Sequence, residues 1–272
     1  MELYGRTSAL QIGVAGSAGI TSSGLRIRFR IECSRTAAPN KAELTIYNLS
    51  RASRTLLLVP TVTVRFLAGY TAPSLLFAGN PIKGGIAIER QGPDTVTTVS
   101  AQDGGNALKN TRIELSFTTA TKLSQVYAAV LAQLAIAPGV VQLANDIELS
   151  SGFAYVGPAG PLLNRLALMS EGDWWVSDET LYLVGNGLSA GTPAVTFSAT
   201  ARSLIGEPTV RADGRVEARG LLSPTLRPGG LFTIQSSKTN GTYVAEDVVF
   251  VGDTGGWETP YYTEAVGKPL AA

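Results

Sequence analysis

The feature that most constrains the fold is a run of nine residues in which apolar and polar side chains alternate strictly. The run extends from Leu25 to Cys33 and reads Leu-Arg-Ile-Arg-Phe-Arg-Ile-Glu-Cys. Successive side chains of a β-strand point to opposite faces, so the run predicts a half-buried strand. Arg26, Arg28 and Arg30 then form a basic stripe on its polar face. We expect this stripe to face solvent or another subunit.

The same period of two recurs in the first and last parts of the chain. The expected strands are Ala42–Asn48, Val62–Leu67, Leu75–Ala78, Ile82–Glu89, Thr95–Ala101, Thr209–Ala212, Arg215–Leu221, Leu231–Gln235 and Thr242–Val251. Turn-forming residues separate them, with Gly92-Pro93-Asp94 before one strand and Asp213-Gly214 before another. The first region is therefore expected to be an antiparallel barrel or sandwich.

Helical spacing appears mainly in the middle of the chain. Apolar residues recur every three to four positions over Lys122–Leu134, where Thr121 can cap the helix, and over Pro161–Ser170. Trp174–Val176 and Leu181–Val184 predict a short hairpin after the second helix. In the first region, Ser50 can cap a short helix that begins at Arg51.

This order of elements predicts a mainly β fold with a smaller α+β insert, in which two tube-like β-barrel domains flank the middle region. The expected domains are 1–110, 111–195 and 196–272. A chain of 272 residues is long enough for each to have its own core.

Charge is scarce and unevenly distributed. Only 16% of the residues are charged, and the three expected domains carry net charges of +6, −4 and −1. A low charge content favours a chain that hides surface against partners. The zoning suits subunits that dock by complementary faces, and it is equally compatible with chance variation between domains.

The chain has no histidine and a single cysteine, Cys33. The commonest general base, the commonest metal ligand and the nucleophile pairs that depend on histidine are therefore missing. Cys33 ends an apolar run and is expected to be a buried structural thiol. We predict no catalytic residue, no cofactor and no metal site.

Carboxylates beside tryptophans offer the one enzymatic alternative. Acidic residues surround Trp174 and Trp175 at Glu171, Asp173, Asp178 and Glu179. Paired carboxylates next to aromatic residues are typical of glycan-cleaving sites. Turns also favour acidic residues, and we consider the structural interpretation much stronger.

One segment resembles a known family. It is Pro-Asn-Lys-Ala-Glu-Leu-Thr-Ile-Tyr-Asn-Leu-Ser, residues 39–50. The short motifs that follow it occur in the order Ala68-Gly69-Tyr70, Leu76-Phe77-Ala78-Gly79, Asp103-Gly104, Leu204-Ile205-Gly206-Glu207-Pro208, Arg227-Pro228-Gly229, Gly241-Thr242-Tyr243-Val244 and Gly252-Asp253-Thr254. No single motif is diagnostic, but their order and spacing resemble those of phage tail and baseplate hub proteins.

The resemblance implies a virion structural protein rather than an enzyme. Such hubs form a ring, usually of three copies, at the distal end of a tail tube. The implied partners are further copies of the chain, the tail tube protein, a central spike or tail-tip protein, the tape measure protein, and DNA only as cargo passing through the lumen. The basic stripe would then face a subunit or the lumen.

Three further expectations complete the interpretation. The N-terminus does not resemble a signal peptide and no apolar run could span a bilayer, so we expect the chain in host cytoplasm before assembly into a tail baseplate. A tail-tip peptidoglycan hydrolase using the paired carboxylates is the enzymatic alternative. A tail-tube or receptor-binding subunit is the structural one.

Overall fold

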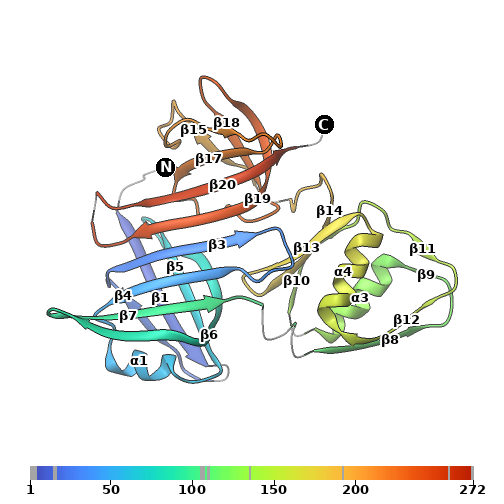
Figure 1. Ribbon diagram of the computed structural model, residues 1–272, viewed down its shortest axis with the longest axis horizontal. Coiled ribbons are helices and arrows are strands. Elements are labelled where there is room, and N and C mark those ends of the chain that lie inside the picture. The colour runs from blue at the N-terminus through green and yellow to red at the C-terminus, as the bar shows by residue number, and fades with distance from the viewer. Residues whose placement is uncertain are drawn as a thin grey trace.

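The computed structural model describes residues 5–14, 17–104, 108, 111–134, 136–191, 193–256 and 258–270. It is mainly β with a smaller part that contains two of the three described helices, as predicted (Figure 1). The smaller part lies beside a large β body, at one end of the long axis of the molecule. None of the helices in the described ranges is long and apolar enough to cross a membrane.

A 13-stranded sheet forms the β body. Its strands are β1 (Arg6–Val14), β2 (Ile20–Ser23), β3 (Ile27–Ser34), β4 (Lys41–Tyr47), β5 (Val62–Tyr70), β6 (Ser74–Gln91), β7 (Asp94–Gln102), β15 (Val195–Ser198), β16 (Thr209–Val210), β17 (Val216–Leu221), β18 (Leu231–Gln235), β19 (Asn240–Asp253) and β20 (Tyr261–Pro269). The order along the main path is β16-β17-β20-β19-β3-β4-β7-β6-β5-β1-β2, and β18 joins β15 to β19.

The alternating run is strand β3, as predicted. Ile27, Phe29, Ile31 and Cys33 are buried, whereas the residues between them are exposed. Strand β3 pairs with β4 on one side and with β19 on the other, both antiparallel. The first and last parts of the chain therefore share one sheet, and their buried residues form one hydrophobic core.

Strand β6 is long and pairs with a different neighbour at each end. Its first residues pair with β5, and its outer part pairs with β7. The sequence predicted two strands here, but one strand runs from Ser74 to Gln91 with a register shift between Pro81 and Ile86. Proline has no backbone N–H to donate to the ladder and is tolerated at such an irregularity. The break between the two predicted strands is therefore the point where one strand changes its pairing partner from β5 to β7.

The smaller part has its own core. Its elements are β8 (Arg112–Phe117), β9 (Thr121–Lys122), α3 (Leu123–Gln133), β10 (Ala137–Gln142), β11 (Glu148–Leu149), β12 (Phe153–Pro158), α4 (Ala159–Met169), β13 (Gly172–Ser177) and β14 (Thr180–Gly185). Helices α3 and α4 bury Tyr127, Leu162 and Leu166 against these short sheets. The predicted cap Thr121 lies one residue too early, because Lys122 is the N-cap of α3.

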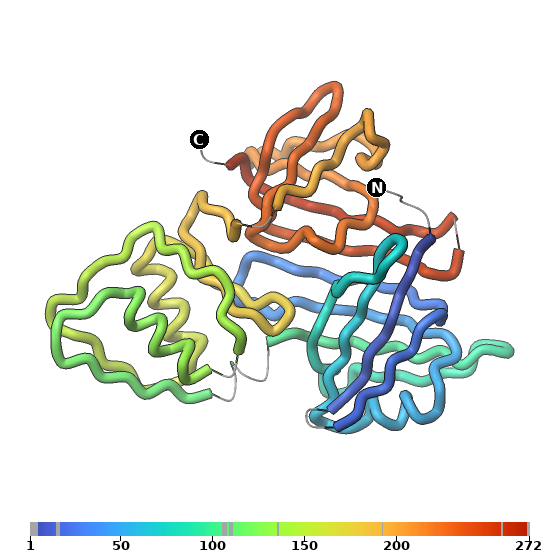
Figure 2. The backbone as a smooth tube through the Cα atoms, turned by 180° about the vertical axis from the view of Figure 1, so that it is seen from behind, coloured from blue at the N-terminus to red at the C-terminus, as the bar shows by residue number. Residues whose placement is uncertain are grey.

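The third helix, α1 (Arg51–Leu57), lies in the β body, and Ser50 caps it by accepting a hydrogen bond from the Ser53 amide. Figure 2 shows from behind that the smaller part lies beside the β body. The predicted boundary at residue 110 lies outside the described residues, and the division into three domains stays a prediction.

Candidate assembly site

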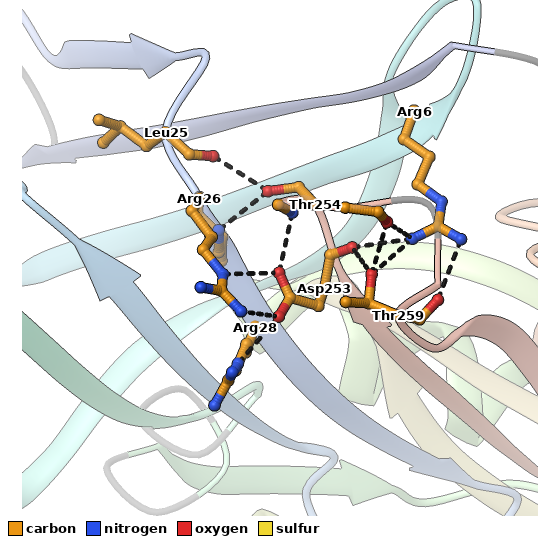
Figure 3. A network of polar contacts seen from close by, with 10 residues as sticks. Arg6, Leu25, Arg26, Arg28, Asp253, Thr254 and Thr259 are labelled. Atoms are coloured by element: carbon orange, nitrogen blue, oxygen red, sulfur yellow. Dashed lines mark hydrogen bonds and ion pairs between the residues drawn. The ribbon is translucent and has the colours of Figure 1, made fainter.

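The basic stripe is not an array of free cations. Arg26 and Arg28 both bind the carboxylate of Asp253, at the end of β19 (Figure 3). Arg26 donates from Nε at 3.1 Å and from Nη2 at 2.8 Å, and Arg28 donates from Nε at 2.9 Å. Arg30 forms an exposed ion pair with Glu32 at 2.8 Å. The structure thus pairs all three arginines within the chain.

The residues around Asp253 form a compact polar cluster that we call the clasp, consisting of Arg6, Arg26, Arg28, Asp253, Thr254 and Thr259. Burial opposes the ionisation of Asp253, but hydrogen bonds from Arg26, the Gly255 amide and Arg28 outweigh it. They lower the pKa of Asp253 to about 2. The carboxylate is therefore ionised over the physiological range.

The other clasp residues bind the backbone. The Thr254 hydroxyl accepts from the Ile27 amide at 2.9 Å and donates to the Leu25 carbonyl at 3.0 Å. Arg6 donates from Nη2 to the Thr259 carbonyl at 3.0 Å and lies over the ring of Tyr261. The clasp thus fixes β1 and β3 to the turn between β19 and β20.

A second polar cluster, which we call the junction, connects the smaller part to the β body. It consists of Arg35, Asn40, Asp103, Asp173, Asp178 and Arg227. The Asp103 carboxylate accepts from the Asn40 amide and side chain, both at 2.8 Å, and from the Asp178 amide at 3.2 Å. Asn40 also donates to the Val176 carbonyl at 3.0 Å. Burial raises the pKa of Asp103 to about 7, against the effect of the hydrogen bonds from Asn40.

Two arginines complete the junction. Arg35 donates to the Val184, Gly185 and Leu188 carbonyls near the end of β14. Arg227 binds Asp178 at 2.8 Å and also donates to the Leu75 carbonyl at 2.6 Å. The junction therefore links the first, middle and last parts of the chain. Sequence reasoning assigned these arginines no role, although Arg227 lies in the Arg-Pro-Gly motif.

The acidic residues proposed for glycan cleavage have structural partners. Asp173 pairs with Arg35 at 3.2 Å, and Asp178 pairs with Arg227. Asp173 lies in strand β13 and Asp178 directly follows that strand, five residues further on, which is about 16 Å in an extended strand. Two cooperating carboxyl groups of a glycosidase lie about 5–9.5 Å apart. Glu171 and Glu179 have positive φ angles of 53° and 64°, typical of turn residues.

The uneven distribution of charge along the sequence is partly accounted for by ion pairs within the chain. Two acids of the negative middle region, Asp173 and Asp178, neutralise arginines of the β body. Within the described residues, no group of three or more acidic or cysteine side chains is placed to hold a metal ion. Cys33 is buried, which raises the pKa of its thiol.

The fold matches those of solved tail and secretion proteins. A tail protein from Neisseria meningitidis aligns with a TM-score of 0.66 at 11% identity, over 96% of this chain and 96% of its own. The 43 kDa tail protein of prophage MuSo2 from Shewanella oneidensis aligns with a TM-score of 0.59 at 12% identity, over 97% and 98%.

A component of the Escherichia coli type VI secretion system, described as similar to tail proteins of bacteriophage T4, aligns with a TM-score of 0.58 at 10% identity, over 96% of this chain and 77% of its own. No protein-family model and no curated protein matches the chain. At these identities the likeness establishes the fold, and it supports the resemblance seen in the sequence at that level.

Proposed function

We propose that this chain is a structural hub of a phage or phage-like tail. Copies of the chain, three in our proposal, form a ring that joins the tail tube to a central spike or tail-tip protein. The regions 1–110 and 196–272 serve as two tube-like domains, and 111–195 is the domain between them. The protein acts in the virion baseplate after synthesis in host cytoplasm, and DNA passes through its lumen during genome ejection.

The observation that carries the proposal is the continuity of the sheet between the first and last regions. The path from β16 to β6 crosses from one region to the other through the β19–β3 pair. Two tube-like units fused side by side in one chain allow three copies to match a sixfold tube. The ladder between β3 and β19 spans Arg28 to Ser34, which supports the proposal that the two units act as one wall.

Two edges of this sheet are open. In the described part of the chain, β16 pairs only with β17, and the outer part of β6 pairs only with β7. Ile82 and Ile88 on β6 are 40% and 43% exposed, and Val210 on β16 is 60% exposed. Open edges with exposed aliphatic residues are templates for pairing with another chain.

A closed ring can form if two different edges pair between neighbouring copies of the chain. When the β6 edge of one copy meets the β16 edge of the next, the contact is head-to-tail, and such contacts form rings when the rotation closes. In this arrangement the polar face of β3 belongs to the wall of the ring. The basic stripe of Arg26, Arg28 and Arg30 lies on that face, and we propose that it faces the lumen or a neighbouring subunit.

Mass measurement of the purified protein tests the ring. We expect a discrete oligomer for the natural chain, and monomers for Ile88→Lys and Val210→Lys, because each lysine places a charge on a paired edge. Leu168→Lys is the matched control, since Leu168 is 81% exposed on α4 and away from both edges. It should leave the oligomer unchanged.

Two outcomes would reject the hub. Monomers of the natural chain both in solution and in intact particles would remove the ring. Spontaneous growth into long tubes would instead favour a tail-tube subunit, because a hub stops at one closed ring. A separate assay tests the hydrolase alternative. If the natural chain cleaves peptidoglycan and Asp173→Asn abolishes the cleavage, the hydrolase is favoured.

A further inference from the structure

A cavity of about 500 Å³ opens beside the clasp and plays no part in the function proposed above. It lies between the first residues of β1, the end of β2 and the turn that follows β19. Arg6, Ser8, Ser23, Arg26 and Gly255 are among its lining residues. None of the described residues that line it is acidic.

The clasp gives this cavity a positive environment. Its side chains comprise three guanidinium groups, those of Arg6, Arg26 and Arg28, and the single carboxylate of Asp253. That carboxylate already accepts from Arg26 twice, from Arg28 and from the Gly255 amide. It carries one negative charge against the two guanidinium groups that it binds, those of Arg26 and Arg28.

Three residues that line the cavity have donor groups without a partner among the described residues. These groups are Nη1 of Arg26 and the hydroxyls of Ser8 and Ser23. The Arg26 side chain is 39% exposed, and Asp253 binds its Nε and Nη2 atoms. The guanidinium is therefore oriented in advance while one of its edges stays available.

We propose that this cavity binds a single oxyanion, the size of a phosphate or a carboxylate group. A guanidinium and hydroxyl groups donate to such oxygens, and an arginine prefers planar or tetrahedral oxyanions to other ligands. The excess positive charge attracts the anion, and Arg26 connects the site to the clasp. An acidic side chain of a neighbouring protein and a free phosphate present the same chemistry.

Calorimetric titration of the full chain at low ionic strength tests the site, because salt screens an exposed anion site. We use inorganic phosphate in one arm and acetate in the other. Saturable binding of either, with a Kd on the order of 1–10 mM, is expected. Phosphate alone identifies a phosphate ligand, and acetate binding supports the carboxylate of a protein partner. No saturable binding in either arm overturns the proposal.

A matched pair of variants locates the site. Ser23→Asp places a carboxylate in the cavity and should weaken anion binding at least about 10-fold, without removing a clasp residue. Thr21→Asp adds the same charge to the same exposed face of β2, but Thr21 does not line this cavity, and binding should persist. Equal binding by both variants would place the anion elsewhere and overturn the proposal. Ring formation is measured separately and does not enter this test.

Discussion

Arg26 and Asp253 are 227 positions apart in the chain, yet they form a two-point ion pair with hydrogen bonds of 3.1 and 2.8 Å. The pair connects the residue before β3 to the end of β19, at the place where the first and last parts of the chain share a sheet. The region where the clasp and the β3–β19 ladder join the first and last parts of the chain is called the seam. Because Arg28 binds the same carboxylate, Asp253 is at the centre of the seam. Four predictions follow from this seam and from the junction.

Asp253→Asn should destabilise the protein. The variant leaves Arg26 and Arg28 without their counter-charge, at a cost of about 1–3 kcal/mol, moderated by the exposure of both arginines. The pKa of Asp253 is lowered to about 2, so its contribution is present above about pH 4 and is lost as the pH falls toward 2. Urea unfolding from pH 2 to 7 measures both effects. Glu32→Gln, which breaks only the exposed pair with Arg30, should cost less than about 1 kcal/mol.

Stability should fall as the pH rises from about 4 to about 7, because of Asp103. Its pKa is raised to about 7, so the native state retains a proton that the unfolded chain has released, and deprotonation favours unfolding. The loss should reach up to about 4 kcal/mol. Asp103→Asn should flatten this part of the stability profile. An identical slope in the variant and the natural chain would show that Asp103 does not titrate in this window.

Gly252→Ala should weaken the seam through packing. A Cβ atom at this position would overlap the Phe29 ring, and Phe29 is buried in the core. Overpacking of this kind costs about 1–3 kcal/mol. Gly256→Ala, in the following turn, meets nothing closer than 3.6 Å and should be nearly neutral. Thermal unfolding of the two variants measures the difference, and equal midpoints would contradict the close approach.

Arg227→Gln should loosen the smaller part without unfolding the β body. The arginine binds Asp178 and the Leu75 carbonyl, and its removal leaves a half-buried carboxylate without its partner. Hydrogen exchange should accelerate in β13 and β14, whereas strand β3 keeps its protection. Arg211→Gln, which breaks an exposed pair with Glu217, is the control. Uniform acceleration across the whole chain would mean that Arg227 supports the core instead.

Local pattern predicted many elements well, and the misses have physical causes. The alternation of β3, the helix after Ser50 and the hairpin of β13 and β14 were each predicted from a short segment. Strand β1 was missed because its residues are mostly half-buried and do not alternate sharply. The Gly-Asp-Thr and Arg-Pro-Gly motifs entered the sequence analysis only through the family resemblance, and the sequence contains no signal that pairs them with Arg26 or Asp178.

The sequence by itself determined that the chain is mainly β with a helical insert, that histidine chemistry is absent, and that three arginines share one face of a strand. These properties depend on residue type and on near neighbours, which a linear pattern records. Only the tertiary structure decided that the first and last regions join in one sheet and that Asp253 neutralises Arg26 and Arg28. Those contacts join residues more than 200 positions apart, and burial in the fold, not local propensity, selects them.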